Sequence, residues 1–159
     1  MDTWRATYAG IVPEKVLAGF TYAVSERRWR KRLRDRNDGS KAFVVGEDGG
    51  VVAGFVVAGP ARETVEDYDG EVYAIYISPE HQGRGCGRAL MSIAARHLLA
   101  DGFQSMMLWV LRDNPACRFY ERLGGAQVSE KSIEIEGTRL VEIAYGWRDL
   151  SALVTLEEQ

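Results

Sequence analysis

A glycine-rich segment in the middle of the chain could bind an anion. It reads Gln82-Gly-Arg-Gly-Cys-Gly-Arg88 and lies between an apolar run, residues 72–77, and a stretch of good helix formers. The first amides of a helix have no partner inside it, and no Ser, Thr, Asp or Asn stands just ahead of Gly83 to cap them. Glycine lets backbone approach a ligand closely, and the arginines add positive charge. We therefore expect a phosphate or pyrophosphate here; a tight strand–helix turn without a ligand is the alternative.

The spacing of these glycines sets the segment apart from two other phosphate-binding loops. A Walker loop would continue with Gly-Lys-Ser/Thr, and the dinucleotide pattern is G-x-G-x-x-G, whereas this chain has G-x-G-x-G. Leu90, Ile93, Ala94 and Leu98 fall at helical spacing after the loop, and Gly102 is a plausible stop. We expect a buried strand, the glycine-rich turn and a long helix, in that order.

Composition limits the kind of protein. The 159 residues argue for a single domain over 1–159, and 46% hydrophobic with 27% charged residues suits a soluble one. No apolar run approaches the ~20 residues that span a membrane, and the start lacks the order of a signal peptide. Cys86 and Cys117 form no metal-ligand pattern, nor do His81, expected to be exposed, and His97, expected to be structural. The chain is expected to be cytoplasmic, with no metal.

Net charge is −3, which makes nucleic acid an unlikely general partner. Residues 27–36 nevertheless hold seven basic residues in ten, with Trp29 and Leu33 one helical turn apart. A solvated helix face is the simplest interpretation. Contact with cofactor phosphates, an acidic partner or nucleic acid are the alternatives, and the last predicts steeply salt-dependent association.

The remaining pattern predicts a mixed α/β sheet. We expect strands over 42–47, 51–58, 71–78, 104–111, 127–136 and 139–147, with turns at 37–41, at 48–50 and around Gly137. Helices are expected in part of 2–19 and over 114–123, the latter with Asn114 as cap and Pro115 at its first position. Residues 59–70 are expected to form a loop or flap.

Two blocks of this sequence resemble the GNAT superfamily of N-acetyltransferases. Gln82–Gly87 is similar to its Q/R-x-x-G-x-G/A signature, and 108–124 is similar to its second block, with a strand, an Asn, a short helix carrying Phe-Tyr and a closing Gly. The resemblance covers roughly residues 4–148. It implies a mixed, mostly antiparallel central sheet flanked by helices. Members normally begin with a β-strand, which we do not expect in this chain, so the next strand would be an exposed edge that favours a homodimer or lowers stability.

The resemblance also implies a reaction and its residues. Acetyl-CoA would donate an acetyl group to a primary amine of a small molecule or a protein. Tyr120 would protonate the leaving thiolate, and Glu71, with Tyr73 on its face, would act as base through water. Another base position of the family holds Trp109 here. The cofactor would be bound by Ile75, Tyr76, Ile77, Gln82, Gly83, Arg84, Gly85, Gly87, Arg88 and Asn114.

Each of these roles has a structural alternative. Tyr120 could be a core residue, Asn114 only a helix cap, Glu71 a solvated strand-end carboxylate, and Arg84 and Arg88 surface residues. A non-catalytic acyl-CoA-binding module is the rival to the enzyme, and transfer through a cysteine is disfavoured. Acidic residues cluster in 63–71 and would attract a cationic acceptor.

Overall fold

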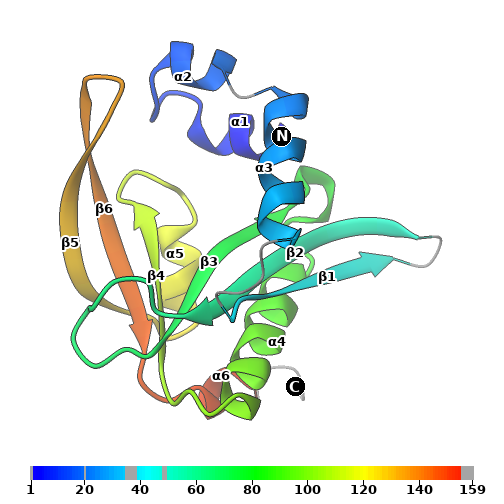
Figure 1. Ribbon diagram of the computed structural model, residues 1–159, viewed down its shortest axis with the longest axis vertical. Helices are drawn as coiled ribbons and strands as arrows, with labels where there is room; N and C mark the ends of the chain where they lie inside the picture. The colour runs from blue at the N-terminus through cyan, green and yellow to red at the C-terminus, as the bar shows by residue number, and fades with distance from the viewer. Residues whose placement is uncertain (1, 20, 35–38, 48–49, 155–159) are drawn as a thin grey trace.

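The computed structural model describes residues 2–19, 21–34, 39–47 and 50–154. Its centre is a six-stranded sheet in the order β1-β2-β3-β4-β6-β5. The strands are β1 (Lys41–Glu47), β2 (Val51–Pro60), β3 (Gly70–Ile77), β4 (Met106–Leu111), β5 (Ala126–Ile135) and β6 (Thr138–Trp147). All neighbouring strands are antiparallel except β3 and β4, which run parallel (Figure 1). The expected mostly antiparallel, mixed sheet flanked by helices is thus confirmed.

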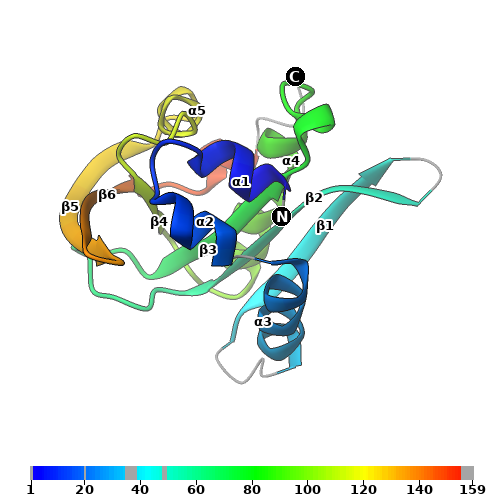
Figure 2. The ribbon, with the colours of Figure 1, turned by 90° about the horizontal axis from the view of Figure 1, so that it is seen from above.

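Helices cover both faces of the sheet. They are α1 (Asp2–Tyr8), α2 (Glu14–Gly19), α3 (Tyr22–Arg34), α4 (Cys86–Ala100), α5 (Cys117–Arg122) and α6 (Ser151–Val154), with a 3₁₀ turn η2 (Pro79–His81). Figure 2 shows α3 and α4 on opposite sides of the strands. The main core lies under α4, where Leu90 and Ala94 are fully buried against Val56 and Leu108. We call this side of the sheet the α4 face.

A smaller cluster lies on the other side, which we call the opposite face. Val65 and Tyr68, from the loop before β3, are buried there with Met107 of β4 and Ala144 of β6. Farther along the same side, Trp29 of α3 sets its ring edge-on against Phe55, with centroids 4.7 Å apart. Trp29 of the basic helix therefore points to the sheet, whereas its described cations are exposed.

Strands β3 and β4 separate soon after they begin. They pair only at Gly70–Met106 and Glu71–Met107, although both strands continue for several residues (Figure 1). A bulge helps to bend β3, because Val57 and Ala58 of β2 are opposite Ala74 and Val72, which leaves Tyr73 as the extra residue. A wedge-shaped gap therefore opens between two adjacent parallel strands.

Asp69 fixes the closed end of this wedge. Its carboxylate accepts hydrogen bonds from the backbone amides of Gln104 and Ser105, each at 2.9 Å, and from the Ser105 hydroxyl at 2.8 Å. Burial alone would raise the pKa of Asp69, but the donors together hold that pKa below its ordinary value. This acidic residue of the 63–71 cluster thus has a structural role.

Most boundaries expected from the sequence are confirmed to within a few residues. The first helical region is divided into α1 and α2, and α3 begins earlier than expected, at Tyr22. Helix α5 begins at Cys117 rather than at Pro115, and α6 and η2 were not expected. Glu136 and Gly137 both have positive φ in the expected last hairpin. The expected turns at 37–41 and 48–50 include residues 37, 38, 48 and 49, which lie outside the described residues.

Strand β1 has β2 as its one neighbour among the described strands, so the exposed edge expected from the sequence is present. Its Val44 is 64% exposed. Within the described ranges, none of the helices combines the length and apolar character needed to cross a membrane.

Candidate active site

A cavity of about 570 Å³ fills the wedge between β3 and β4. Side chains and backbone from five parts of the chain line it: α1, β3, the glycine-rich loop with the start of α4, β4, and α5 with the turn before it. All the expected site residues line this cavity except Glu71 and Arg84. They are Ile75, Tyr76, Ile77, Gln82, Gly83, Gly85, Gly87, Arg88, Asn114 and Tyr120.

The start of α4 leaves backbone amides available at one end of the cavity. Gly85 occupies the N-cap position with φ 87° and provides no side-chain cap. Gly83 also has a positive φ, 71°, and a Cβ added to either glycine would meet nothing within 4 Å. Amides of a 15-residue helix therefore face open space beside Arg88, as an anion site requires.

Gly87 has a different role from the other two glycines. A Cβ at this position would lie 2.9 Å from Phe119 Cζ and 3.0 Å from Ile77 Cδ1. The lack of a side chain therefore lets α4 pack closely against α5 and the end of β3. Gly87 was expected to contribute to phosphate binding. Its position also requires glycine for packing, which the sequence pattern did not reveal.

The cavity side of β3 has an unused sheet edge. Beyond Glu71, β3 pairs with β2 on one side and has no strand neighbour on the other among the described residues. Ile75, Tyr76 and Ile77 line the cavity along this edge. An extended chain could add to it as a further strand does. Gln82 closes the end of the edge, since its side-chain amide donates to the Ile77 carbonyl at 3.1 Å.

Tyr120 contributes a buried phenol to the cavity wall. It is 6% exposed, and its ring packs against Tyr145 and Trp147, with centroids 5.9 and 6.3 Å away. Burial, assisted by the nearby Tyr8, Cys117 and Tyr76, raises its pKa, so the hydroxyl keeps its proton. Within the described part of the chain no hydrogen bond engages this hydroxyl, which leaves the proton available to a ligand.

Asn114 connects α5 to the first helix. Its Oδ1 accepts from the Ala116 amide at 2.8 Å in the turn before α5, so the expected cap position was wrong: Ala116 is the N-cap and the helix begins at Cys117. Its Nδ2 donates to the Tyr8 hydroxyl at 3.4 Å. Tyr8 lines the cavity, and burial raises its pKa although the Asn114 contact acts to lower it. Tyr8 was not among the expected site residues; its only signal was helical spacing with Trp4 and Ile11.

Glu71 lies outside the cavity lining, and the structure corrects both interpretations of it. The carboxylate is 1% exposed, so it is not a solvated strand-end group. Arg62 donates to both oxygens: its backbone amide to Oε2 at 2.9 Å and its Nη2 to Oε1 at 2.6 Å. This pairing raises the pKa of Arg62. Because Arg62 engages both of its oxygens, Glu71 anchors the loop that precedes β3.

The arginine of that pair also contacts Tyr73. The guanidinium carbon of Arg62 lies 4.5 Å from the centroid of the Tyr73 ring, and the Tyr73 hydroxyl donates to the Pro60 carbonyl. Tyr73 lines the cavity, but its hydroxyl is hydrogen-bonded to the Pro60 carbonyl.

Most of the acidic cluster 63–71 is paired, which removes the basis for expecting an acidic field from it. Glu63 binds Lys131 at 2.7 Å, Glu66 binds Arg148, and Glu71 binds Arg62. With Asp69 holding the closed end of the wedge, Asp67 is the remaining acidic residue of the cluster. A cationic acceptor must be argued from other residues.

The two histidines and two cysteines lie outside the cavity lining. His81 was expected to be exposed, and that was wrong. It lies in η2 and is buried, with 5% of its surface exposed, and its Nδ1 lies 2.5 Å from the Ser78 hydroxyl oxygen. His97 is structural as expected and stacks on Phe43 with centroids 4.1 Å apart. Burial raises the pKa of Cys117, so its thiol stays protonated and a thiol route gains no support.

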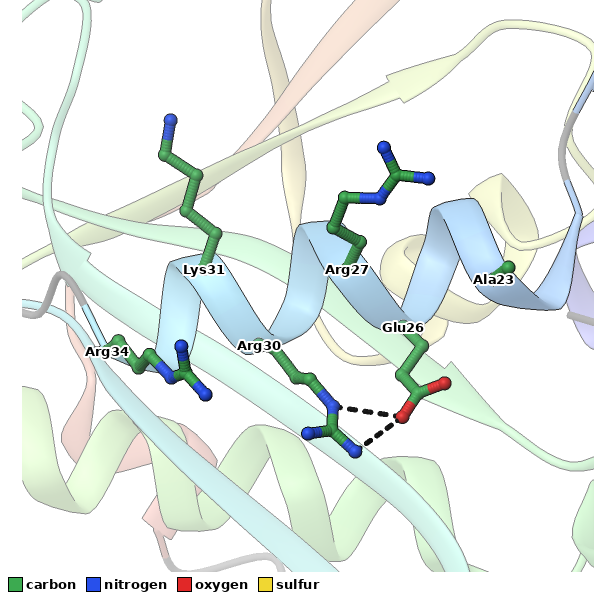
Figure 3. Close-up of a pocket in the computed structure, with 6 residues that line it drawn as sticks. All are labelled: Ala23, Glu26, Arg27, Arg30, Lys31 and Arg34. Carbon is green, nitrogen blue, oxygen red and sulfur yellow. Dashed lines mark hydrogen bonds and ion pairs between the residues drawn. The ribbon is translucent and has the colours of Figure 1, made fainter.

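A second hollow, of about 540 Å³, lies along α3. Figure 3 shows its lining residues on one helix, with Arg30 paired to Glu26 at 2.6 Å. The other basic side chains of the hollow, Arg27, Lys31 and Arg34, extend from the same helix (Figure 3). They are exposed, as the solvated-face interpretation expects. The hollow shares no lining residue with the wedge cavity.

Comparison with known proteins assigns the chain to a family. The family model described as Acetyltransferase (GNAT) family matches residues 5–125. The chain belongs to the GNAT acetyltransferase family. YuaI, an uncharacterized N-acetyltransferase of Bacillus subtilis strain 168, is 43% identical over 156 residues, which cover 98% of this chain and 87% of that protein. The chain is thus an N-acetyltransferase by family, and acetyl-CoA is the acetyl donor of that family.

Solved structures agree with this assignment. Nourseothricin acetyltransferase is 29% identical with a TM-score of 0.59, over 68% of this chain and 64% of that one. The structure of yncA from Salmonella typhimurium, with its cofactor acetyl-CoA, is 25% identical with a TM-score of 0.61, over 77% of this chain and 72% of that one. Both structures share the overall fold of this chain over the regions they cover.

Proposed function

We propose that this chain transfers the acetyl group of acetyl-CoA directly to a primary amine, in the cavity between β3 and β4. The observation that carries the proposal is the junction of two features in one cavity. One is an unpaired strand edge along Ile75–Ile77, and the other is the uncapped start of α4 at Gly85. An extended amide chain ending in a phosphate-rich group fits both, and the pantetheine and pyrophosphate of coenzyme A have that chemistry.

Different residues along the cavity are proposed to bind the pyrophosphate and the pantetheine arm. The amides at Gly83, Gly85 and Gly87, with the guanidinium of Arg88, would hold the pyrophosphate, since all four residues line the cavity at the start of α4. Arg84 lies outside the cavity lining and adds positive charge from the exposed side of the loop. Ile75, Tyr76 and Ile77 would hold the pantetheine arm from one side and Asn114 from the other. When bound, acetyl-CoA supplies a thioester whose carbonyl an amine can attack.

Tyr120 is proposed as the general acid of this reaction. Its burial keeps the phenol protonated, and its hydroxyl is not engaged by the described protein residues while the residue lines the cavity. A thiolate that departs there would carry a proton affinity near that of a free thiol, pKa about 8.5. Tyr120 can meet that charge with a hydrogen bond and a proton, and its ring is held in place by Tyr145 and Trp147.

The acceptor is proposed to be a primary amine that binds as a cation, of a small molecule or a protein. Support comes from the opposite face, where the ammonium of Lys131 lies 4.0 Å from the centroid of the Trp109 ring and 2.7 Å from Glu63. Because Trp109 lines the cavity, its ring also offers an aromatic surface to the ammonium of an acceptor.

A homodimer through the β1 edge is part of the same proposal. The edge strand and the exposed Val44 support it. Sedimentation equilibrium over a range of concentrations tests it, and a monomer at every concentration would contradict it without affecting the proposed reaction.

The decisive experiment measures turnover and donor binding separately. Wild-type protein is incubated with acetyl-CoA and a panel of primary amines, free thiol release is followed, and products are weighed by mass spectrometry. Calorimetry measures acetyl-CoA binding. Binding without thiol release for any amine would refute the enzyme and favour a non-catalytic acyl-CoA-binding module.

A matched pair of glycine variants tests the donor site. Gly85→Val and Gly102→Val each place a β-branched residue at a positive φ, 87° and 94°, where neither Cβ meets an atom within 4 Å. Each should cost roughly 1–2 kcal/mol of strain. Only Gly85→Val should weaken acetyl-CoA binding, by at least tenfold, because Gly102 is at the far end of α4. Equal affinity in both variants would contradict the proposed pyrophosphate site.

A further inference from the structure

Three carboxylates lie near the cavity on the opposite face of the sheet, and two of them are already engaged. Glu71 receives hydrogen bonds from Arg62 on both oxygens. Glu63 receives Lys131 Nζ on both oxygens, at 2.9 and 2.7 Å. For Glu142, the one contact of the carboxylate among the described residues is Lys131 Nζ, 3.8 Å from Oε2. Glu142 thus keeps lone pairs available for a proton.

Glu142, like Glu71, is not one of the residues that line the cavity, but strand register places it near Trp109, which does line it. It is directly opposite Leu111 of β4 and Lys131 of β5, while Trp109 is opposite Ala144 two positions along β6. Residues opposite each other share a face, so Glu142, Lys131 and Trp109 lie on one side of the sheet. Lys131 bridges them, with its ammonium over the Trp109 ring. The Glu142 side chain is 24% exposed, which leaves it accessible from that face.

The charges around Glu142 suit a proton acceptor. Burial raises the pKa of its carboxyl; Lys131 and Arg62 lower it, and Glu63 raises it further. The charge of Glu142 in turn contributes to raising the pKa of Tyr8, which lines the cavity. A carboxylate whose pKa lies above its ordinary value is a stronger base.

We propose that Glu142, rather than Glu71, takes the proton from the acceptor ammonium in this enzyme. The inference rests on the proposed function. Glu142 accepts the proton of one N–H bond, directly or across one water, which frees the nitrogen lone pair. As the new N–C bond forms and the C–S bond breaks, Tyr120 gives its proton to the departing sulfur. The nitrogen of the adduct loses its second proton to solvent, which leaves a neutral amide; solvent also takes the proton from Glu142 and returns one to Tyr120, so one proton is released overall.

The test is the pH dependence of Glu142→Gln, measured with an amine that the wild type accepts. At pH 7 kcat/KM should fall by ~10²–10⁴-fold, the usual worth of a general base. Activity should then recover as pH rises toward the acceptor's own pKa, about 10.4 for a lysine-like amine, because free amine needs no base. Acetyl-CoA affinity, measured by calorimetry, should be unchanged.

Two further variants separate a chemical role from a structural one. Glu130 lies on β5, in the same β5–β6 hairpin as Glu142, and its carboxylate is 55% exposed and paired with Arg112. Glu130→Gln should therefore leave the pH profile unchanged. Lys131→Met removes the cation that lowers the Glu142 pKa, so the acidic limb of kcat/KM should move to higher pH. A merely structural role of Glu142 predicts neither this shift nor the alkaline recovery.

The outcomes are distinguishable. Near-normal activity of Glu142→Gln at pH 7, or a loss that does not recover at high pH while the variant is folded, overturns the inference and leaves the proposed function intact. Absence of wild-type turnover with every amine overturns both.

Discussion

Replacing Tyr120 by phenylalanine isolates one hydroxyl in the cavity. The ring, its 5.9 Å contact with Tyr145 and its edge-on contact with Trp147 remain, so the packing of α5 should be preserved. Because no described residue hydrogen-bonds this hydroxyl, its removal breaks no internal bond. We expect the stability of the variant to stay within about 0.5 kcal/mol of the wild type.

The expected effect on turnover is large by comparison. A positioned general acid is worth ~10²–10⁴-fold, so kcat should fall by that factor. Acetyl-CoA binding should change little, since the hydroxyl acts on charge that develops only as the C–S bond breaks. Steady-state kinetics at saturating acetyl-CoA measure kcat, and calorimetry measures binding.

Tyr145→Phe is the matched control. Tyr145 lies beside Tyr120 and is equally buried, but its hydroxyl donates to Glu121 Oε1 at 2.7 Å. Its removal should therefore cost about 1 kcal/mol, or roughly 2–4 °C in Tm for a chain of this size, with normal kcat. The two variants should thus show opposite patterns: one loses turnover and the other loses stability.

One result would refute this reasoning. If Tyr120→Phe retains near-normal turnover at saturating acetyl-CoA while circular dichroism shows an intact fold, Tyr120 only shapes the cavity. The general acid would then have to be sought elsewhere, and Tyr8 would be the next phenol on the cavity wall.

Two further predictions concern acidic residues whose roles are structural. Glu71→Gln should lower stability by ~1–3 kcal/mol in urea denaturation, less than a fully buried pair because Arg62 is 53% exposed. Its kcat should stay near the wild-type value, whereas a ~10²-fold fall would restore Glu71 as the base. Asp69 has a lowered folded-state pKa, so its stabilisation is present above the unfolded value of about 3.9 and is lost as pH falls through the folded value. Thermal unfolding measured between pH 7 and pH 3 should show that Tm falls less in Asp69→Asn than in the wild type as the pH is lowered. Equal decreases in Tm would contradict this role of Asp69.

Local residue patterns were sufficient to predict the donor half of the site. The apolar run of β3, the glycine-rich loop and the start of α4 are contiguous, so their order in the chain already puts an uncapped helix start next to a strand end. The Phe-Tyr pair and Asn114 came from a second contiguous block. These signals depend on neighbours within one or two turns, and the strand and helix types they predicted are present.

What the sequence could not decide depends on contacts between distant residues. The pairing of Arg62 with Glu71, and of Lys131 with Glu63 and Glu142, joins segments whose separation no local pattern specifies. Sequence alone therefore presented 63–71 as an acidic surface, although folding neutralises most of it. Tyr8 reaches the cavity only because α1 lies over the wedge beside Asn114.

The sequence by itself predicted the strands, the glycine-rich loop and the long helix after it, because glycine spacing and apolar runs act over a few residues; phosphate binding by that loop remains a prediction. The tertiary structure alone decided which carboxylate keeps lone pairs available for a proton. That choice depends on where each cation lies once β3 and β4 have separated and β5 has brought Lys131 over Trp109. Burial and pairing, rather than residue type, distinguish Glu142 from Glu71, and both are properties of the assembled sheet.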